Sequence, residues 1–306
     1  MQTLELKFDV SAVCNIGIPL HVAASLHLPE AINSETAPPE MSLIFAIHGG
    51  GYTRQYWHPT FAEETYSFAE FFTKKGQAVL AIDMLGMGRS SKPEDEALLS
   101  RATIATAHDS ALRQAIEGLS NGQWSKAQHV EVTGMGHSMG GMMIITQAAA
   151  FGGMNRLASL GWANAPMQLG DMDSEEMQPS ALPTGYLPAP REAMRGFFYA
   201  GDVPLEIIEA DEAHGSLTPS CMGRDALTPA IVKNAAAALK IPVLVVQSSI
   251  DTSSDPQSEA GYFTSSPDVQ IQILEGAAHC QNFASNRAEH WAALHQWMEN
   301  TSPARV

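Results

Sequence analysis

Residues 128–145 read QHVEVTGMGHSMGGMMII and pass from a β-rich run, through a Gly-x-Ser-x-Gly motif, into an apolar helical run. A serine placed in this order between strand and helix is forced onto a sharp, strained turn with its hydroxyl exposed. Because Gly136 and Gly140 lack a Cβ, the strand and the helix can approach closely enough for that turn to close. The segment therefore predicts that Ser138 is a nucleophile.

Strand and helix patterns alternate on either side of this motif. An antiparallel strand pair is expected over residues 3–10 and 18–28. Dense apolar runs at 43–47 and 78–82 are typical of parallel strands that are buried on both faces. Further strands are expected near residues 158–164, 242–247 and 269–274, and helices near residues 60–75, 104–119, 139–151 and 284–299. The alternation implies βαβ units and an α/β fold with a mostly parallel sheet.

Residues 171–240 interrupt this alternation. They show no strong strand pattern but three helix-like pieces, at 191–200, 204–213 and 229–239. A helical insertion between two sheet strands is positioned to cover the carboxyl edge, where ligands bind in open α/β sheets. We therefore expect a core domain, residues 1–170 and 241–306, and a helical cap, residues 171–240.

Charge and cysteine content exclude several functional classes. The 306-residue chain carries 33 acidic and 17 basic residues, a formal net charge of −16. Such a balance repels phosphate backbones and anionic lipid, so we expect no nucleic-acid partner and no membrane partner. Three widely spaced cysteines fit a reducing compartment and argue against a disulfide framework or a thiolate metal site: Cys14, Cys221 and Cys280. Because the first residues resemble a strand rather than a signal peptide, the expected location is cytoplasmic.

A serine hydroxyl becomes a good nucleophile only beside a base that a third group orients. His279 follows the last expected strand, and Asp251 lies in the turn after the strand at 242–247. Both therefore stand at the carboxyl edge, to which Ser138 is also delivered. The agreement of residue type, chain order and strand-end placement predicts a catalytic triad. Asp255 is the alternative acid.

An acyl-transfer site also needs backbone N–H groups aimed at the charge of the tetrahedral intermediate. The N–H of Met139 is one expected donor, because this residue follows the nucleophile at the positive end of a helix dipole. The other is expected from the segment His48-Gly49-Gly50-Gly51-Tyr52, where successive glycines let the backbone approach an acyl oxygen. We favour the N–H of Gly50 for this oxyanion hole, with that of Gly51 second.

These motifs resemble the α/β-hydrolase superfamily over nearly the whole chain. The resemblance is carried by HGGG at 48–51, DMLGMGRS at 83–90, GHSMGG at 136–141, Asp251 and His279. It implies an eight-stranded, mostly parallel sheet flanked by helices, an inserted helical cap, no cofactor, and hydrolysis through a covalent acyl-enzyme. One departure is that residues 247–251, QSSID, lack the glycine often found three residues before the acid, so a different turn is expected there.

Other polar side chains near the motifs are expected to be structural. His48 and His137 are predicted to bond loop backbone through their ring nitrogens. Asp83 is predicted to form a turn. His290 and His295, inside the last expected helix, are predicted to be surface or packing residues, and Cys280 is predicted to be a packing residue or incidental. None of these side chains is assigned a catalytic role.

No metal ion is expected. The cluster Glu209, Asp211, Glu212 and His214 contains metal-binding residue types, but its spacing suits no defined site, and carboxylate runs are usually solvated. The expected partner is instead a small molecule, and a homodimer is compatible with the sequence.

The predicted function is that of a serine hydrolase acting on a small or medium hydrophobic carboxylic ester, thioester or lactone. Residues expected to line a substrate pocket under the cap are Tyr52, Trp57, Trp162, Met167, Phe197 and Phe198. Two kinds of alternative stay open. The same triad would serve a C–C bond hydrolase, an amidase or an acyltransferase, and a hydrolase-derived protein could retain only small-molecule binding.

Overall fold

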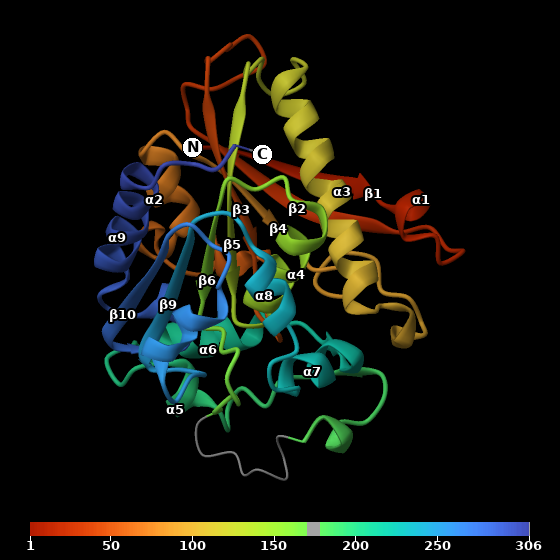
Figure 1. Ribbon diagram of the computed structural model, residues 1–306, viewed down its shortest axis with the longest axis vertical. Helices are drawn as coiled ribbons and strands as arrows, with labels where there is room; N and C mark the ends of the chain where they lie inside the picture. The colour runs from red at the N-terminus through yellow and green to blue at the C-terminus, as the bar shows by residue number, and fades with distance from the viewer. Residues whose placement is uncertain (170–177, 306) are drawn as a thin grey trace.

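A sheet of eight strands runs through the middle of the described chain, with helices on both of its faces (Figure 1). The structure is a computed structural model that describes residues 1–169 and 178–305. The strands are β1 (Gln2–Asp9), β2 (His21–Leu28), β3 (Met41–Ile47), β4 (Ala78–Ile82), β5 (Val130–His137), β6 (Arg156–Leu160), β9 (Val243–Ile250) and β10 (Val269–Ala278).

The strand order across this sheet is β1-β2-β4-β3-β5-β6-β9-β10. Strand β2 runs antiparallel to both β1 and β4. The strands from β4 to β10 are all parallel. The antiparallel pair at the start and the mostly parallel sheet after it are therefore confirmed.

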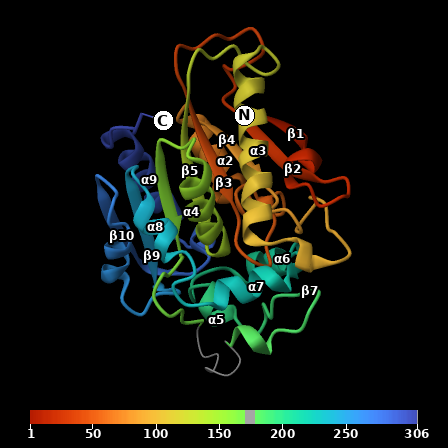
Figure 2. The ribbon, with the colours of Figure 1, turned by 45° about the vertical axis from the view of Figure 1, so that its right-hand side comes forward.

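Each central strand supplies side chains to two hydrophobic layers. The helices are α1 (Ser11–Cys14), α2 (Phe68–Lys74), α3 (Arg101–Ser120), α4 (Met139–Phe151), α8 (Lys233–Ala238) and α9 (Arg287–Asn300). In β3, Leu43 and Phe45 pack in the layer of α3 and α4, whereas Ile44 packs in the layer of α2 and α9. Successive side chains of a strand point to opposite faces. The dense apolar run at 43–47 is therefore buried from both sides (Figure 2).

Serine caps determine where two of the helices begin. The side chain of Ser67 accepts the N–H of Glu70 at the start of α2, and that of Ser100 accepts the N–H of Thr103 at the start of α3. Such caps satisfy N–H groups that the first helical turn leaves free. Helix α3 consequently begins at Arg101, slightly before the start that hydrophobic periodicity predicted.

Residues 178–232, between β6 and β9, cross one end of the sheet, at the carboxyl ends of the parallel strands (Figures 1 and 2). We call residues 178–232 the inserted segment. It contains α5 (Arg195–Phe198), α6 (Leu205–Ala213) and α7 (Ser220–Leu227), and the short strands β7 (Tyr186–Leu187) and β8 (Thr218–Pro219). The predicted helices at 191–200 and 204–213 are present in shorter form.

Three features of this region differ from the prediction. Helix α7 was not anticipated, and β7 and β8 form a short antiparallel pair where no strand was expected. Helix α8, predicted at 229–239 as part of the cap, packs against α4 on a face of the sheet. Its six residues carry four alanines, which allow close packing of the two helices. The predicted boundary between residues 170 and 171 lies outside the described residues.

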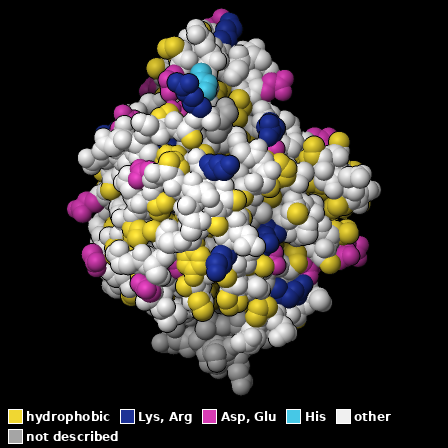
Figure 3. All heavy atoms as spheres, viewed as in Figure 1, with side chains coloured by type: hydrophobic (Ala, Val, Ile, Leu, Met, Phe, Trp, Pro, Cys, Tyr) yellow, Lys and Arg dark blue, Asp and Glu magenta, His cyan; other side chains and the backbone are white. Residues whose placement is uncertain are grey.

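Charged side chains are dispersed over one face of the molecule. On the face shown in Figure 3, Lys and Arg side chains lie among acidic and uncharged residues rather than in a continuous stripe. Within residues 1–169 and 178–305, no helix combines the length and the apolar content needed to cross a bilayer.

Candidate active site

Ser138 stands at the turn between β5 and α4. Its backbone has φ 56° and ψ −125°, a conformation that residues with a side chain rarely adopt. The close approach predicted from the two glycines is present. A Cβ on Gly136 would overlap the carbonyl group of Gly140, and a Cβ on Gly140 would overlap the carbonyl oxygen of Ile47. Packing around the turn therefore holds Ser138 in this strained conformation.

The side chains of His279 and Asp251 meet at the same edge of the sheet. His279 directly follows β10 and Asp251 directly follows β9. The distance from Nδ1 of His279 to Oδ1 of Asp251 is 2.6 Å. The carboxylate also accepts the N–H groups of Ser248 at 2.8 Å and Thr252 at 2.9 Å. These two bonds stabilise the turn at residues 248–252, in the segment that lacks the expected glycine. Asp255, the alternative acid, is exposed to solvent.

Gly161 connects the serine turn with the histidine and aspartate pair. The N–H of Ser138 donates to the carbonyl of Leu160 at 2.7 Å. The next residue, Gly161, has φ +61°, and a Cβ there would lie 3.1 Å from both the His279 ring and the Asp251 carboxylate. Sequence reasoning missed Gly161. The available signal was a glycine inside the strand predicted at 158–164, next in the chain to the strand that delivers the serine.

The loop after β3 holds the backbone N–H of Gly50 in one direction. His48 accepts the N–H of Met84 at Nε2, so its proton lies on Nδ1, which donates to the carbonyl of Gly49 at 2.7 Å. In a planar trans peptide the N–H points opposite to the carbonyl. The N–H of Gly50 is therefore turned away from His48, and among the described residues it has no hydrogen-bond acceptor. His48 has the structural role that was predicted, and burial lowers its pKa.

The other two predicted oxyanion donors differ from each other. Met139 is the first residue of α4, and its N–H has no acceptor within the described residues. The N–H of Gly51, by contrast, already donates to Oγ1 of Thr218 at 2.8 Å. Of the three predicted donors, Gly50 and Met139 are thus the two whose N–H groups have no acceptor among the described residues.

A cavity of about 250 Å³ opens beside Ser138 and His279. Five of the six predicted pocket residues line it: Tyr52, Trp162, Met167, Phe197 and Phe198. The inserted segment adds further apolar walls, among them Leu182, Leu187, Met194 and Leu227. Among the described residues that line this cavity there is no Lys, Arg, Asp or Glu. The described lining is therefore largely apolar and uncharged, and its polar members include Thr218, Ser220 and the groups around Ser138.

Trp57 does not line the cavity, contrary to the prediction. Its ring packs edge-on against Tyr56 and Phe68, with centroid distances of 5.1 Å and 4.9 Å. The short 3₁₀ turn Arg54–Tyr56 precedes it and directs its indole toward α2. Trp57 is completely buried and belongs to the hydrophobic core.

Phe197 of the inserted segment also contacts the loop that carries His279. The N–H of His279 donates to the carbonyl of Phe197 at 3.1 Å, and the Phe197 ring stacks on the imidazole at 4.7 Å. From the other side, Nε2 of His137 donates to the carbonyl of His279 at 2.8 Å. Burial lowers the pKa of His137, which keeps this ring neutral. His137 therefore has the structural role that was predicted.

The model of the alpha/beta hydrolase family matches residues 43–293 of the chain. The protein belongs to this family. Among solved structures, this alpha/beta hydrolase is similar to an esterase from Exiguobacterium antarcticum, with TM-score 0.67 and 13% identity over 97% of this chain and 100% of that chain. It is also similar to a bromoperoxidase from Bacillus anthracis, with TM-score 0.65 and 18% identity over 97% and 100% of the two chains.

A third similar structure is a monoacylglycerol lipase from Paleococcus ferrophilus, with TM-score 0.63 and 16% identity over 93% of this chain and 100% of that chain. At these identities the likeness concerns the fold, because one fold serves many activities. A comparison with curated proteins gives no match.

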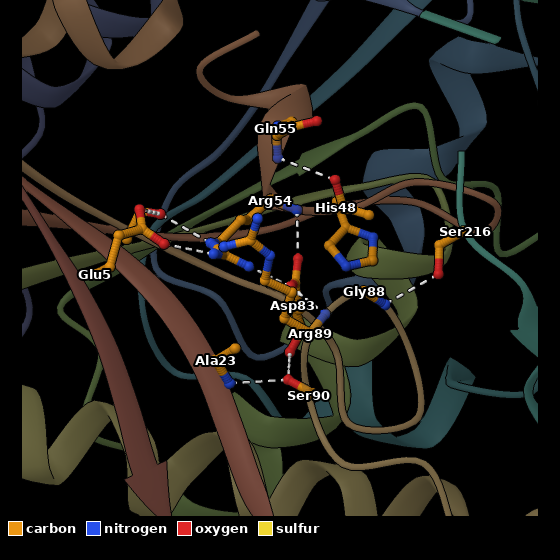
Figure 4. Close-up of polar contacts among 12 residues, drawn as sticks. Glu5, Ala23, His48, Arg54, Gln55, Asp83, Gly88, Arg89, Ser90 and Ser216 are labelled. Carbon is orange, nitrogen blue, oxygen red and sulfur yellow. Dashed lines mark hydrogen bonds and ion pairs between the residues drawn. The ribbon is translucent and has the colours of Figure 1, made fainter. Parts of the chain in front are cut away.

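In this alpha/beta hydrolase, Asp83 links the loop that carries Arg54 to the loop that carries Arg89 (Figure 4). Its carboxylate accepts the backbone N–H groups of Arg54 and Arg89, each at 2.7 Å, and forms an ion pair with the Arg54 guanidinium. The hydroxyl of Ser90 donates to the Asp83 carbonyl at 2.7 Å. The predicted turn-forming role of Asp83 is confirmed, and the buried ion pair is an addition that sequence reasoning did not include.

The acidic cluster at 209–214 is engaged by arginines. Asp211 forms a buried ion pair with Arg191 and accepts a hydrogen bond from the Tyr52 hydroxyl at 2.9 Å. Glu212 pairs with Arg195 at 2.6 Å. Among the described residues, no group of three or more His, Cys, Asp and Glu side chains is arranged to hold a metal ion. These contacts tie α5 and α6 to the loop that carries Tyr52.

Proposed function

We propose that this protein is a serine hydrolase that cleaves a small or medium hydrophobic carboxylic ester, with thioesters and lactones in the same class. One observation carries the proposal. Ser138, on a strained turn, lines an apolar cavity together with His279, whose second ring nitrogen is bonded to the buried Asp251. A nucleophile, a base and a group that orients the base are the parts that acyl transfer requires.

The mechanism follows from the roles of these groups. Oγ of Ser138 attacks the substrate carbonyl while Nε2 of His279 takes the hydroxyl proton. Asp251 holds Nδ1–H and stabilises the imidazolium that forms. The N–H groups of Gly50 and Met139 bind the oxyanion. His279 then protonates the leaving alcohol, and a water molecule activated by the same ring releases the acid from the acyl-enzyme.

The cavity walls support a neutral, apolar substrate. A charged group placed there would lose its hydration without gaining an ion pair, because the described lining residues carry no opposite charge. The volume of about 250 Å³ is below the usual range of about 300–1,000 Å³ for drug-sized ligands. Short and medium acyl groups therefore fit this site better than long chains or polymers.

Labelling with a fluorophosphonate tests the proposal. We expect one modified peptide, containing Ser138, and turnover of p-nitrophenyl butyrate that falls by roughly 10⁴-fold or more in Ser138→Ala. The melting temperature of Ser138→Ala is the structural control. It should change little, because loss of one hydroxyl leaves the turn intact. Modification of another residue, or equal turnover by the wild type and the variant, would refute the proposal.

A further inference from the structure

Residues of the inserted segment form hydrogen bonds with both the N–H and the carbonyl of Gly51. Oγ1 of Thr218 accepts the Gly51 N–H at 2.8 Å, and the N–H of Ser216 donates to the Gly51 carbonyl at 2.9 Å. Arg191 adds a longer contact from Nη1 to the same carbonyl, at 3.5 Å. The loop after β3 is thus bonded to residues that lie far away in the sequence.

These contacts matter because Gly50 lies between two peptide planes. His48 fixes the first plane by donating to the carbonyl of Gly49. Thr218 fixes the second plane by accepting the N–H of Gly51. A glycine has unusually free backbone dihedrals, so one fixed plane would leave its conformation open. The Gly50 N–H lies in the first plane, and the second bond fixes the φ and ψ of Gly50, so the position of this N–H is held from both sides before a substrate arrives.

Thr218 is itself held in place. It pairs with Leu187 in the short β7–β8 ladder, and its Oγ1 lies 3.8 Å from the position a Cβ would take on Gly50. Two residues earlier, the hydroxyl of Ser216 accepts the N–H of Gly88 at 2.9 Å (Figure 4). The acceptor for Gly51 is therefore anchored to the core loop at Gly88. Donors that need no reorganisation during the reaction contribute most to oxyanion binding.

We propose that Thr218 is a positioning residue of the oxyanion site: its hydroxyl holds the Gly51 N–H and thereby aims the Gly50 N–H at the developing oxyanion. The inference rests on the proposed hydrolase function. It makes the inserted segment a part of the catalytic geometry as well as a wall of the cavity, because the oxyanion loop is complete only when residues 216–218 lie against it.

The test compares Thr218→Val, which keeps the side-chain shape and removes the acceptor, with Thr218→Ser, which restores the acceptor. For p-nitrophenyl butyrate we expect Thr218→Val to lower kcat by about 10- to 100-fold, less than the loss of an oxyanion donor itself, with KM nearly unchanged. Thr218→Ser should stay within about threefold of the wild type. Thr228→Val is the matched control, because the Thr228 hydroxyl bonds the Arg224 carbonyl within the same segment and does not contact the oxyanion loop.

Two ketones separate positioning from packing. A hexyl trifluoromethyl ketone accepts Oγ of Ser138 at its carbonyl carbon, the proton passes to His279, and the carbonyl oxygen becomes the oxyanion. Hexyl methyl ketone fills the cavity largely without this addition. We expect Thr218→Val to weaken inhibition by the trifluoromethyl ketone by the same factor as kcat/KM, while inhibition by the methyl ketone is unchanged.

Two outcomes would overturn the inference alone. One is that the wild type is active and Thr218→Val has the same kcat. The other is an equal weakening of both ketones together with a raised KM, which would make Thr218 only a wall of the cavity. A wild type that neither turns over the ester nor reacts at Ser138 would instead remove the proposed function, and the inference with it.

Discussion

At Gly161 the absence of a side chain allows the histidine and aspartate pair to close. The residue has φ +61°, and any Cβ would press on both the His279 ring and the Asp251 carboxylate. The nearby Ser138 is also held at positive φ. Two neighbouring positions in the site therefore have backbone conformations that most residues avoid, and the surrounding packing supports them.

Gly161→Ala should damage activity more than its effect on stability explains. We expect kcat to fall by about 10-fold, because the His279 ring must shift to make room. The free energy of unfolding should fall by about 1–2 kcal/mol from the positive φ. Kinetics with p-nitrophenyl butyrate and urea unfolding measure the two effects.

Gly152→Ala is the control for backbone strain. Gly152 has φ +67°, but no atom lies within 4 Å of its Cβ position. It should lose similar stability and keep its activity. If both variants keep the same kcat, the space at Gly161 has no role in catalysis.

Among the secondary-structure elements, the parallel strands and α5 bring the site together. Strands β5, β9 and β10 end at one edge and deliver Ser138, Asp251 and His279. Helix α5 approaches from the inserted segment and bonds the His279 backbone through the carbonyl of Phe197. Helix α9 lies farther from the site, and Trp291 and Leu294 attach it to the layer of α2.

Helix α9 contains a buried histidine that should make the protein sensitive to acid. His290 is 1% exposed, and neither ring nitrogen has a hydrogen-bond partner among the described residues. Burial lowers its pKa to about 4. Because an unfolded histidine has a pKa of about 6.5, the unfolded state binds more protons between about pH 4 and 6.5. Stability therefore falls as the pH decreases through this window.

His290→Leu should reduce this sensitivity. We expect the loss in unfolding free energy between about pH 7.5 and pH 5 to be smaller by about 2 kcal/mol than in the wild type. Urea unfolding at the two pH values measures it. His129→Leu, at an exposed histidine, is the control and should leave the pH dependence unchanged. An unchanged pH dependence in His290→Leu would show that folding does not shift the pKa of this ring.

The whole molecule combines an acidic surface with an apolar cavity. Its formal net charge is −16, and the described residues that line the cavity carry no charged side chain. An anionic substrate would be repelled at long range and would then lose its hydration in the cavity. Both effects favour neutral esters.

A comparison of p-nitrophenyl butyrate with the monoanionic p-nitrophenyl succinate tests this selectivity. We expect kcat/KM to be lower for the anion by on the order of 100-fold or more. Added salt should recover only a small part of the difference, because salt screens the surface charge but does not change the cavity. Similar kcat/KM values for the two esters would mean that a cation reaches the bound substrate.

Local sequence was sufficient for the strands and for the serine turn. The run at 43–47 predicts a strand buried on both faces, and the spacing of Gly136, Ser138 and Gly140 predicts the strained turn, because each depends on a few neighbouring residues. The antiparallel start and the parallel sheet followed from the same kind of pattern. The α7 helix and the placement of α8 did not, since propensity in a segment of short helices is weak.

Tertiary packing decided the remaining features of the site. The sequence favoured Asp251 over Asp255 by its strand-end position, but only the folded chain places its carboxylate against His279. Trp57 is aromatic like most of the predicted pocket residues, but the preceding turn directs its side chain into the core. The bond between Gly51 and Thr218 joins two segments whose local patterns carry no mark of each other. Such contacts form only when distant segments pack, so no local periodicity or turn rule encodes them.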